Sequence, residues 1–310
     1  MTPPRRLYCS DAARLRGDDN IATAARVDLW ILVEFPCTWG RDPICDSALP
    51  APVREALERA TREIPRSRVV FIRKRVEPPR ECRVYLARSG PRAGLLALDL
   101  PTVDDVATVP FAALAAEPLA PPQRPLILVC THGQHDSCCG RRGYPLFDAL
   151  QRRDDIDVWQ CSHIGGDRFA ANALVLPWGL YYGPVEPRDA EALVATALND
   201  EIYLAAFRGR SSQSRPVQAA ETFVRRTHVV TRRDAFRLLQ RETLVDGRMR
   251  IHLRDDEGTL HDVTLEHFVE SEEAFATCTA KEPAPLRQFR LVDYRFTERR
   301  ETERSSTEAH

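Results

Sequence analysis

The sequence has almost no lysine, little methionine and no long apolar run. Its 310 residues include two methionines, and its only lysines are Lys74 and Lys281, so arginine supplies nearly all of the positive charge. No apolar run approaches the roughly 18 residues that a membrane-spanning helix needs. The residues before Cys9 lack the apolar segment of a secretory signal. These absences predict a cytoplasmic protein that has no membrane partner.

Several common functional signatures are also missing. The formal net charge is −1, so no nucleic-acid partner is expected. The chain has no G-x-G-x-x-G loop, no phosphate-loop lysine, no H-E-x-x-H, no G-x-S-x-G and no C-x-x-C pair. Apolar residues make up 43% of the chain, which is typical of globular proteins, and its length suggests about two domains.

Cysteine is the residue type that the chain does have in quantity. The nine cysteines are Cys9, Cys37, Cys45, Cys82, Cys130, Cys138, Cys139, Cys161 and Cys278. An odd number in a chain without a secretory signal argues against a disulfide framework. Four of the nine fall within residues 130–161, so we expect metal or redox chemistry there.

The predicted elements repeat along the chain. The first half is predicted to contain strands at 30–35, 68–75, 83–88 and 94–100 and helices at 52–64 and 103–115. The second half is predicted to contain strands at 125–130, 156–163, 171–177 and 180–183 and helices at 144–153 and 188–207. Both halves thus read strand, cysteine-bearing loop, helix, three strands, helix. This order predicts an α/β chain with two related lobes, at 1–120 and 121–209.

The last third of the chain has a different pattern. Residues 221–240 are predicted to form one or two helices. Residues 248–254 and 261–268 alternate around the turn at 255–258, which is typical of a hairpin. We therefore expect a small C-terminal α+β extension at 210–297, followed by a disordered tail at 298–310.

Two segments carry the residues that suggest chemistry, CTHGQHDSCCGRRG and WQCSHIGGDRFAAN. In the first, Cys130 ends a buried strand and Cys139 stands just before the predicted helix, where a thiolate is favoured. In the second, His163 ends a strand and two glycines allow a turn that returns Asp167. Two ligands from each segment can enclose one inorganic centre. His132 and His135, in the first segment, could act as ligands or protonation partners, but loop histidines are more often solvated, and we expect that here.

The kind of centre follows from ligand type and spacing. Zinc accepts cysteine, histidine and carboxylate, but its structural sites usually contain close C-x₂₋₄-C pairs, whereas Cys130 and Cys139 are nine residues apart. A [2Fe–2S] cluster takes two ligands per iron, and mixed Cys/His ligation occurs in Rieske centres. The spacing favours iron–sulfur and leaves zinc open. Histidine ligation also predicts a reduction potential that depends on pH and exceeds that of an all-cysteine cluster.

The segments CTHGQHDSCCGRRGYPLFDAL, CSHIGGDRFAANALVLPWGLYYG and WILVEFPCTWGRDPICDSALP resemble the sucrase/ferredoxin-like family, over about residues 9–205. The resemblance implies thioredoxin-like lobes, with a [2Fe–2S] cluster in the second. It places the first two cluster ligands at Cys130 and Cys139. The family's second pair, at C-x₃-C or H-x₃-H spacing, falls on His163 and Asp167.

The aspartate departs from the family pattern and leaves the fourth ligand open. Cys161 lies two residues before His163, so on a strand it would share the same face. Cys138 is adjacent to Cys139 and is a further alternative, as is solvent. Asp167 would then orient His163 instead of binding the metal.

The first half repeats the ligand loop only in part. Cys37 and Cys45 resemble the first ligand pair, but the matching later loop at 87–92 carries neither cysteine nor histidine. We expect this lobe to be a degenerate copy without a cluster. Cys9, Cys82 and Cys278 have no predicted partner.

These features predict an electron-transfer protein that carries a [2Fe–2S] cluster with mixed Cys/His ligation. It is expected to act as a non-enzymatic electron carrier between an unidentified reductase and an unidentified acceptor protein. The sequence leaves open whether the chain forms a homodimer. The alternatives are a zinc-stabilised binding protein, a thiol oxidoreductase that uses Cys138 and Cys139 or another cysteine pair, and an iron–sulfur reductase with its own substrate, such as a ferric chelate.

Overall fold

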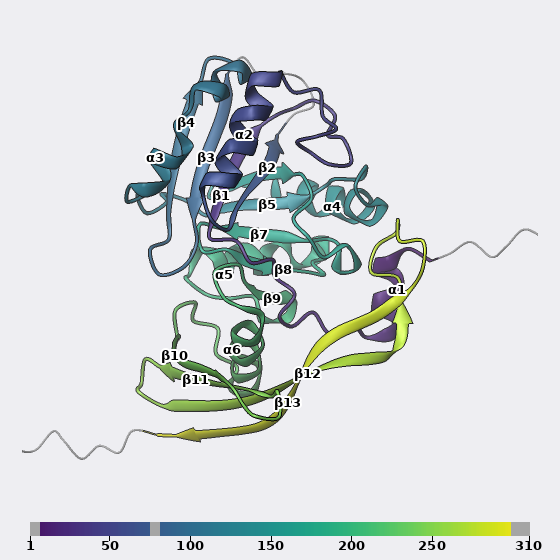
Figure 1. Cartoon of the computed structure of the whole chain (residues 1–310), viewed down its shortest axis with the longest axis vertical. Helices are drawn as coiled ribbons and strands as arrows, with labels where there is room; N and C mark the ends of the chain where they lie inside the picture. Colours follow the sequence, from purple (N-terminus) through teal and green to yellow (C-terminus); the bar gives the residue numbers. More distant parts are fainter. Residues whose placement is uncertain (1–6, 75–80, 299–310) are drawn as a thin grey trace, which may run out of the picture.

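The computed structural model of the chain describes residues 7–74 and 81–298 and contains two β-sheets with helices packed on them (Figure 1). No helix in these two ranges is both long enough and apolar enough to cross a membrane. Most of the predicted disordered tail, residues 299–310, lies outside the described residues.

The first half of the chain supplies four strands of the large sheet. These are β1 (Leu29–Glu34), β2 (Ser67–Arg73), β3 (Cys82–Arg88) and β4 (Gly94–Leu100), and helix α2 (Ala51–Glu63) connects β1 to β2. β1 is parallel to β2 and antiparallel to β3, and β3 is antiparallel to β4. The prediction of a single helix at 103–115 is wrong. The segment forms a 3₁₀ helix, η1 (Val103–Thr108), and a short helix, α3 (Phe111–Ala116), because Pro110 prevents a continuous helix.

The second half supplies four strands in the same arrangement. These are β5 (Leu126–Cys130), β6 (Asp157–Cys161), β7 (Ala173–Leu176) and β8 (Leu180–Tyr182), and helix α4 (Ser137–Leu150) connects β5 to β6. β5 is parallel to β6 and antiparallel to β7, and β7 is antiparallel to β8. An antiparallel pairing of β2 with β6 joins the two sets. Together with β9 (Phe207–Arg210), they form one sheet in the order β4-β3-β1-β2-β6-β5-β7-β8-β9.

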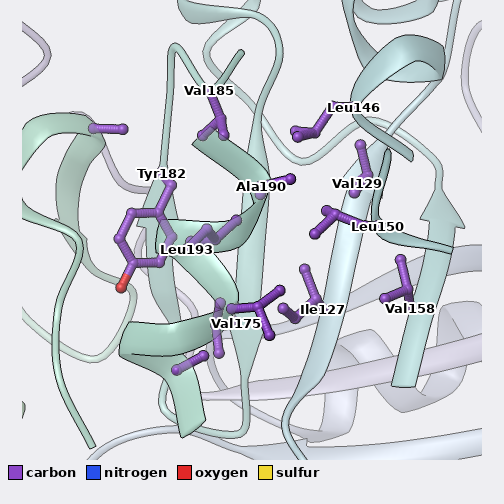
Figure 2. Close-up of a cluster of buried hydrophobic side chains, with 14 of the residues drawn as sticks. Ile127, Val129, Leu146, Leu150, Val158, Val175, Tyr182, Val185, Ala190 and Leu193 are labelled. Carbon is purple, nitrogen blue, oxygen red and sulfur yellow. The ribbon is translucent and has the colours of Figure 1, made fainter. Parts of the chain in front are cut away.

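Apolar packing fixes α4 against the strand that precedes it. Figure 2 shows Leu146 and Leu150 of α4 close to Ile127 and Val129 of β5, and all four side chains are fully buried. Helix α5 (Ala190–Leu198) contributes Leu193 to the same core. Because helix and strand are held together, the loop between them has a defined position.

The long helix predicted at 188–207 is much shorter in the structure. A 3₁₀ helix, η3 (Pro187–Asp189), leads into α5, which ends at Leu198. The chain then turns at Asp200, which has a φ of +57°. After a second 3₁₀ helix, η4 (Leu204–Ala206), β9 pairs with β8 at the edge of the sheet. The apolar pattern of 188–207 predicts one helix, but the left-handed backbone conformation of Asp200 interrupts it.

The C-terminal region forms helix α6 (Arg215–His228) and a second sheet. Its four strands are β10 (Phe236–Thr243), β11 (Met249–Asp255), β12 (Leu260–Ala274) and β13 (Ala284–Thr297). They lie side by side in the sheet in the same order as in the chain. The hairpin predicted around 255–258 joins β11 to β12. The helical prediction for 221–240 is wrong from residue 229 onward, because α6 ends at His228 and β10 pairs with β11, and β13 was not predicted.

A buried ion pair links α6 to the large sheet. The Oε1 atom of Glu221 lies 2.8 Å from Nε of Arg225 and 3.0 Å from Nε of Arg210, which belongs to β9. Burial alone would raise the pKa of the Glu221 carboxyl, but Arg210 and Arg225 lower it to about 2. The carboxylate is therefore charged at neutral pH, and it attaches α6 to the sheet edge.

The first helix and the turn between β12 and β13 meet beside α4. Helix α1 (Cys9–Arg16) was not predicted, because residues 1–28 read as polar and irregular. Residues 260–265 of β12 pair with both β11 and β13, whereas the later part of β12 pairs with β13 alone within the described strands. This two-stranded ribbon extends away from the sheet. Its turn lies beside α1, as the yellow and purple segments of Figure 1 show.

Candidate metal centre

The first pair of predicted ligands lies on the loop and helix that follow β5. Cys130 is the last residue of β5, and Cys139 lies in the first turn of α4. The prediction that the helix starts at 144 is thus wrong, because the side chain of Asp136 accepts a hydrogen bond from the N–H of Cys138 and caps a helix that begins at Ser137. Backbone N–H groups and the helix dipole at this end favour thiolates.

A close approach of helix and strand brings these two cysteines together. Gly143 of α4 passes the end of β5, and a Cβ atom at this position would lie 2.0 Å from the carbonyl oxygen of Cys130. No side chain fits in that space, so only glycine permits the approach. Cys139, one helical turn earlier, consequently faces the end of β5.

The second pair lies on a turn that two glycines allow. Gly165 and Gly166 have φ values of +102° and +87°, which are unfavourable for residues with a side chain. The turn returns Asp167 toward His163, and Oδ1 of Asp167 lies 3.1 Å from Nδ1 of His163. The same oxygen lies 3.2 Å from Sγ of Cys139, whose distance to Nδ1 of His163 is 3.9 Å.

The structure therefore brings all four predicted site residues together. The ligand atoms of Cys130, Cys139 and His163 lie within 4.8 Å of one another, and Asp167 contacts two of these three residues. We call this group the candidate cluster site: Cys130, Cys139, His163 and Asp167.

Burial divides the candidate cluster site into an inner and an outer side. Cys130 and Cys139 are fully buried, whereas the His163 side chain is 14% exposed. Hydrogen bonds from Cys139 and then from Cys161 lower the pKa of the Cys130 thiol well below its usual value, against the effect of burial. Burial raises the pKa of the Asp167 carboxyl, and the neighbouring His163 opposes this. Two sulfur donors thus lie inside, and a nitrogen and an oxygen donor lie toward the surface.

The two cysteines considered as alternative ligands lie outside the group of close ligand atoms, although the Cys161 thiol is hydrogen-bonded to that of Cys130. Cys161 pairs with Cys130 across the parallel strands β5 and β6 and is fully buried among core side chains. Within residues 7–74 and 81–298, it does not join the mutually close ligand atoms of Cys130, Cys139 and His163. Cys138 points to the opposite side of the α4 N-terminus and contacts Cys9 and Cys278.

His132 and His135 are not simply solvated, contrary to expectation. The ring of His135 stacks on that of His163, with 3.7 Å between centroids, and His135, His163 and Asp167 form a second group of close ligand atoms. His132 is 2% exposed. Its Nδ1 accepts a hydrogen bond from the N–H of His163, so its Nε2 carries the proton and donates to the Gly40 carbonyl at 2.8 Å. His132 consequently fixes the backbone of a candidate ligand.

The cysteine-bearing loop of the first half forms one wall of the site. The carbonyl oxygen of Arg41 lies 3.2 Å from Nδ1 of His135, which places the loop directly against the ligand loop. Cys37 and Cys45 themselves are exposed. A surface cleft of about 510 Å³ lies between the two loops, and its lining includes Arg41, Arg68, His135 and His163. The outer side of the candidate cluster site is therefore accessible from this cleft.

A buried arginine that sequence reasoning missed holds the second ligand turn. Arg208 is 1% exposed, and its guanidinium donates to the carbonyl oxygen of Gly165 at 3.1 Å and to Oδ1 of Asn172 at 2.7 Å. Asn172 in turn donates to the carbonyl oxygen of Gly166 at 2.9 Å. Burial lowers the pKa of Arg208 to about 10, so it remains charged at neutral pH. Arg208 belongs to β9, which was not predicted as a strand and begins where the predicted helix at 188–207 ends, so nothing in the sequence associated it with the turn.

Comparison with known proteins agrees with the resemblance of the sequence motifs. Residues 21–209 match the sucrase/ferredoxin-like family. Altered inheritance of mitochondria protein 32 from Clavispora lusitaniae is 30% identical over 122 residues, which cover 33% of this chain and 45% of that protein. The protein of the same name from Debaryomyces hansenii is 35% identical over 95 residues, covering 27% of this chain and 35% of that protein. The chain thus spans less than half the length of these relatives.

Among solved structures, the chain is similar to a thioredoxin-like [2Fe–2S] ferredoxin from Aquifex aeolicus. The two are 20% identical with a TM-score of 0.25, and the similarity covers 28% of this chain and 91% of the ferredoxin.

Proposed function

Because the chain belongs to the sucrase/ferredoxin-like family, we propose that it is an electron-transfer protein that holds a [2Fe–2S] cluster at the candidate cluster site. One observation supports this most directly. Two buried thiols and a partly exposed imidazole, from segments 24 residues apart, meet within 4.8 Å, with a carboxylate beside them. When bound, such a cluster supplies one-electron redox chemistry.

The residues present fit this group in number and kind. A [2Fe–2S] cluster needs two ligands per iron. Cys130 and Cys139 would supply the inner pair. The pKa of the Cys130 thiol is lowered, whereas the hydrogen bond to Cys130 and burial raise the pKa of the Cys139 thiol, so metal binding would displace the proton of Cys139. His163 and Asp167 would supply the outer pair. His135 stacks on His163 and lies near the same carboxylate, so it replaces Cys161 and Cys138 as the strongest alternative for the fourth ligand.

The cleft gives a redox partner access to the outer pair. The ring of His163 lies at the cleft, and Arg68 holds its backbone by donating to the carbonyl oxygen of His163 at 2.6 Å. A reductase or acceptor protein that docks there would come closest to His163. His132 and Arg208 would keep the ligand segments in place while the charge of the site changes.

Both halves of the large sheet are thioredoxin-like lobes in this proposal, at 1–120 and 121–209. The matching arrangement of β1–β4 and β5–β8 supports this. The first lobe would carry no cluster, and its cysteine-bearing loop would instead cover the site of the second.

The burial of the adjacent cysteines argues against a thiol oxidoreductase. Cys138 and Cys139 are both fully buried and contact different sets of residues. An oxidoreductase needs a thiol that a second molecule can reach. Zinc would accept the same four donors, so metal analysis must decide between zinc and iron.

The test is anaerobic purification of the full chain, followed by a visible spectrum and by iron and sulfide assays on the same sample. We expect absorption between about 400 and 600 nm, with about two irons and two sulfides per chain. Asp167→Ala should alter the spectrum or reduce the iron content, whereas Cys161→Ala should leave both unchanged. A colourless protein without iron, still colourless after anaerobic reconstitution with iron and sulfide, would contradict the proposal.

A further inference from the structure

A second group of cysteines lies on the other side of the α4 N-terminus. It combines one residue near the start of the described chain, two from its middle and one from the turn between β12 and β13. Cys9 begins α1, Cys138 lies in the first turn of α4, and Cys278 lies in the turn between β12 and β13. We call this group the tri-cysteine site: Cys9, Cys138 and Cys278, with Asp136 beside them.

The three sulfur atoms form a compact triangle. Sγ of Cys138 lies 3.5 Å from that of Cys9 and 3.2 Å from that of Cys278, and the remaining side measures 3.6 Å. A disulfide would bring two sulfurs to about 2.05 Å and leave the third unpaired. The three sides are nearly equal, so no pair is singled out. A tetrahedral zinc ion, with Zn–S bonds of about 2.3 Å, separates its sulfur ligands by about 3.8 Å, so a small expansion of the triangle admits the ion.

Asp136 supplies a fourth donor. Both of its carboxylate oxygens lie 3.9 Å from Sγ of Cys9. Each oxygen accepts one backbone N–H, from Cys138 at 2.8 Å and from Cys278 at 2.6 Å. A carboxylate oxygen has more than one acceptor position, so these hydrogen bonds orient the group and leave capacity for a metal.

Polar groups donate hydrogen bonds to two of the three sulfur atoms. The hydroxyl of Ser10 lies 3.1 Å from Sγ of Cys138, and the N–H of Ser10 lies 3.5 Å from it. The N–H of Cys9 lies 3.4 Å from Sγ of Cys278. Such donors are the usual surroundings of metal-bound sulfur. Cys9, Cys138 and Asp136 are almost completely buried and Cys278 is partly exposed, so an ion can enter from the ribbon side.

We propose that the tri-cysteine site binds one zinc ion and is separate from the candidate cluster site. Three thiolates and one carboxylate are a donor set that tetrahedral zinc accepts. The ion would connect three segments that are far apart in the sequence. The outer part of the β12–β13 ribbon pairs with no third strand among those described, and an isolated two-stranded ribbon is only marginally stable. Zinc would fix the end of this ribbon and α1 to α4.

The first experiment counts metals in the full-length chain after anaerobic purification in the presence of Zn²⁺. We compare the wild type with Cys278→Ser, whose side chain is on a partly exposed turn, and with the matched control Cys37→Ser, whose side chain is exposed. We expect about one zinc per chain in the wild type and in the control, and none in Cys278→Ser. The iron content should be the same in all three. Equal zinc in the wild type and Cys278→Ser would overturn the proposal.

Two further measurements identify the site. X-ray absorption at the zinc edge is expected to show three sulfur ligands at about 2.3 Å and one oxygen at about 2.0 Å. Zinc that is lost from Cys130→Ser and retained in Cys278→Ser would lie at the candidate cluster site and overturn the proposal. So would a wild-type protein that fails to take Zn²⁺ from a chromogenic chelator under reducing, anaerobic conditions. Because zinc and iron are counted separately, absence of the cluster and absence of the zinc site are distinguishable.

Discussion

Replacement of Gly143 by alanine tests how the first ligand pair is positioned. The added Cβ would lie 2.0 Å from the carbonyl oxygen of Cys130, and real Cβ atoms essentially never approach another heavy atom closer than 3.0 Å. Neither the new Cβ nor the carbonyl oxygen can rotate away, because both are bonded directly to the backbone. Helix α4 or the end of β5 must therefore move by about 1 Å. Metal sites hold their ligand distances to within about 0.2 Å. The displacement therefore exceeds what the pair of Cys130 and Cys139 can tolerate.

We expect Gly143→Ala to lose most of its iron while remaining folded. Alanine favours a helix over glycine by about 1 kcal/mol, and overpacking costs about 1–3 kcal/mol, so the free energy of unfolding should fall by at most about 2 kcal/mol. The matched control is Gly140→Ala on the same helix, where the nearest atom is 3.1 Å away and a shift of a few tenths of an ångström suffices. Iron assays, visible spectra and urea titrations of both variants give the comparison. Full iron content in Gly143→Ala would refute this account of the site.

Three further predictions concern charged groups. Arg210 and Arg225 lower the pKa of Glu221 from 4.5 to about 2. The carboxylate therefore contributes about 3 kcal/mol of stability, which is fully present above pH 4.5 and is lost as the pH falls toward 2. In urea titrations, the difference in unfolding free energy between the wild type and Glu221→Gln should shrink from neutral to acidic pH, and a constant difference would contradict the prediction. For the iron-loaded protein, histidine ligation predicts a reduction potential that falls with rising pH by up to about 59 mV per pH unit, because a metal-bound imidazole can exchange a proton as the charge of the cluster changes. Voltammetry should show a flat potential for His163→Cys, and an equally flat wild type would count against histidine ligation. Arg208→Met should reduce both the iron content and the thermal unfolding temperature, because the Gly165 carbonyl loses its hydrogen-bond donor. An unchanged iron content would show that the turn at Gly165 keeps its conformation without Arg208.

Features that depend on neighbouring residues could be predicted from residue order alone. Alternating and continuous apolar runs located the strands of both halves, because burial periodicity follows directly from residue order. The ligand segments were also readable, since cysteine, histidine and glycine at fixed spacings lie within two short stretches. Where local signals competed, the prediction failed. Asp136 moved the start of α4 forward by capping it, and Pro110 and Asp200 ended helices that apolar content alone would have extended.

Contacts between residues far apart in the sequence are evident only from the folded chain. The approach of Arg208 to the ligand turn and the meeting of Cys9, Cys138 and Cys278 join positions separated by tens to hundreds of residues. Such contacts depend on sheet order and on the direction of the β12–β13 ribbon, and neither leaves a periodic signal in the sequence. The same holds for His135, whose stacking on His163 could not be predicted from its position in the ligand loop. Residue order specifies which side chains could bind a metal, whereas packing of the whole chain decides which of them share one site.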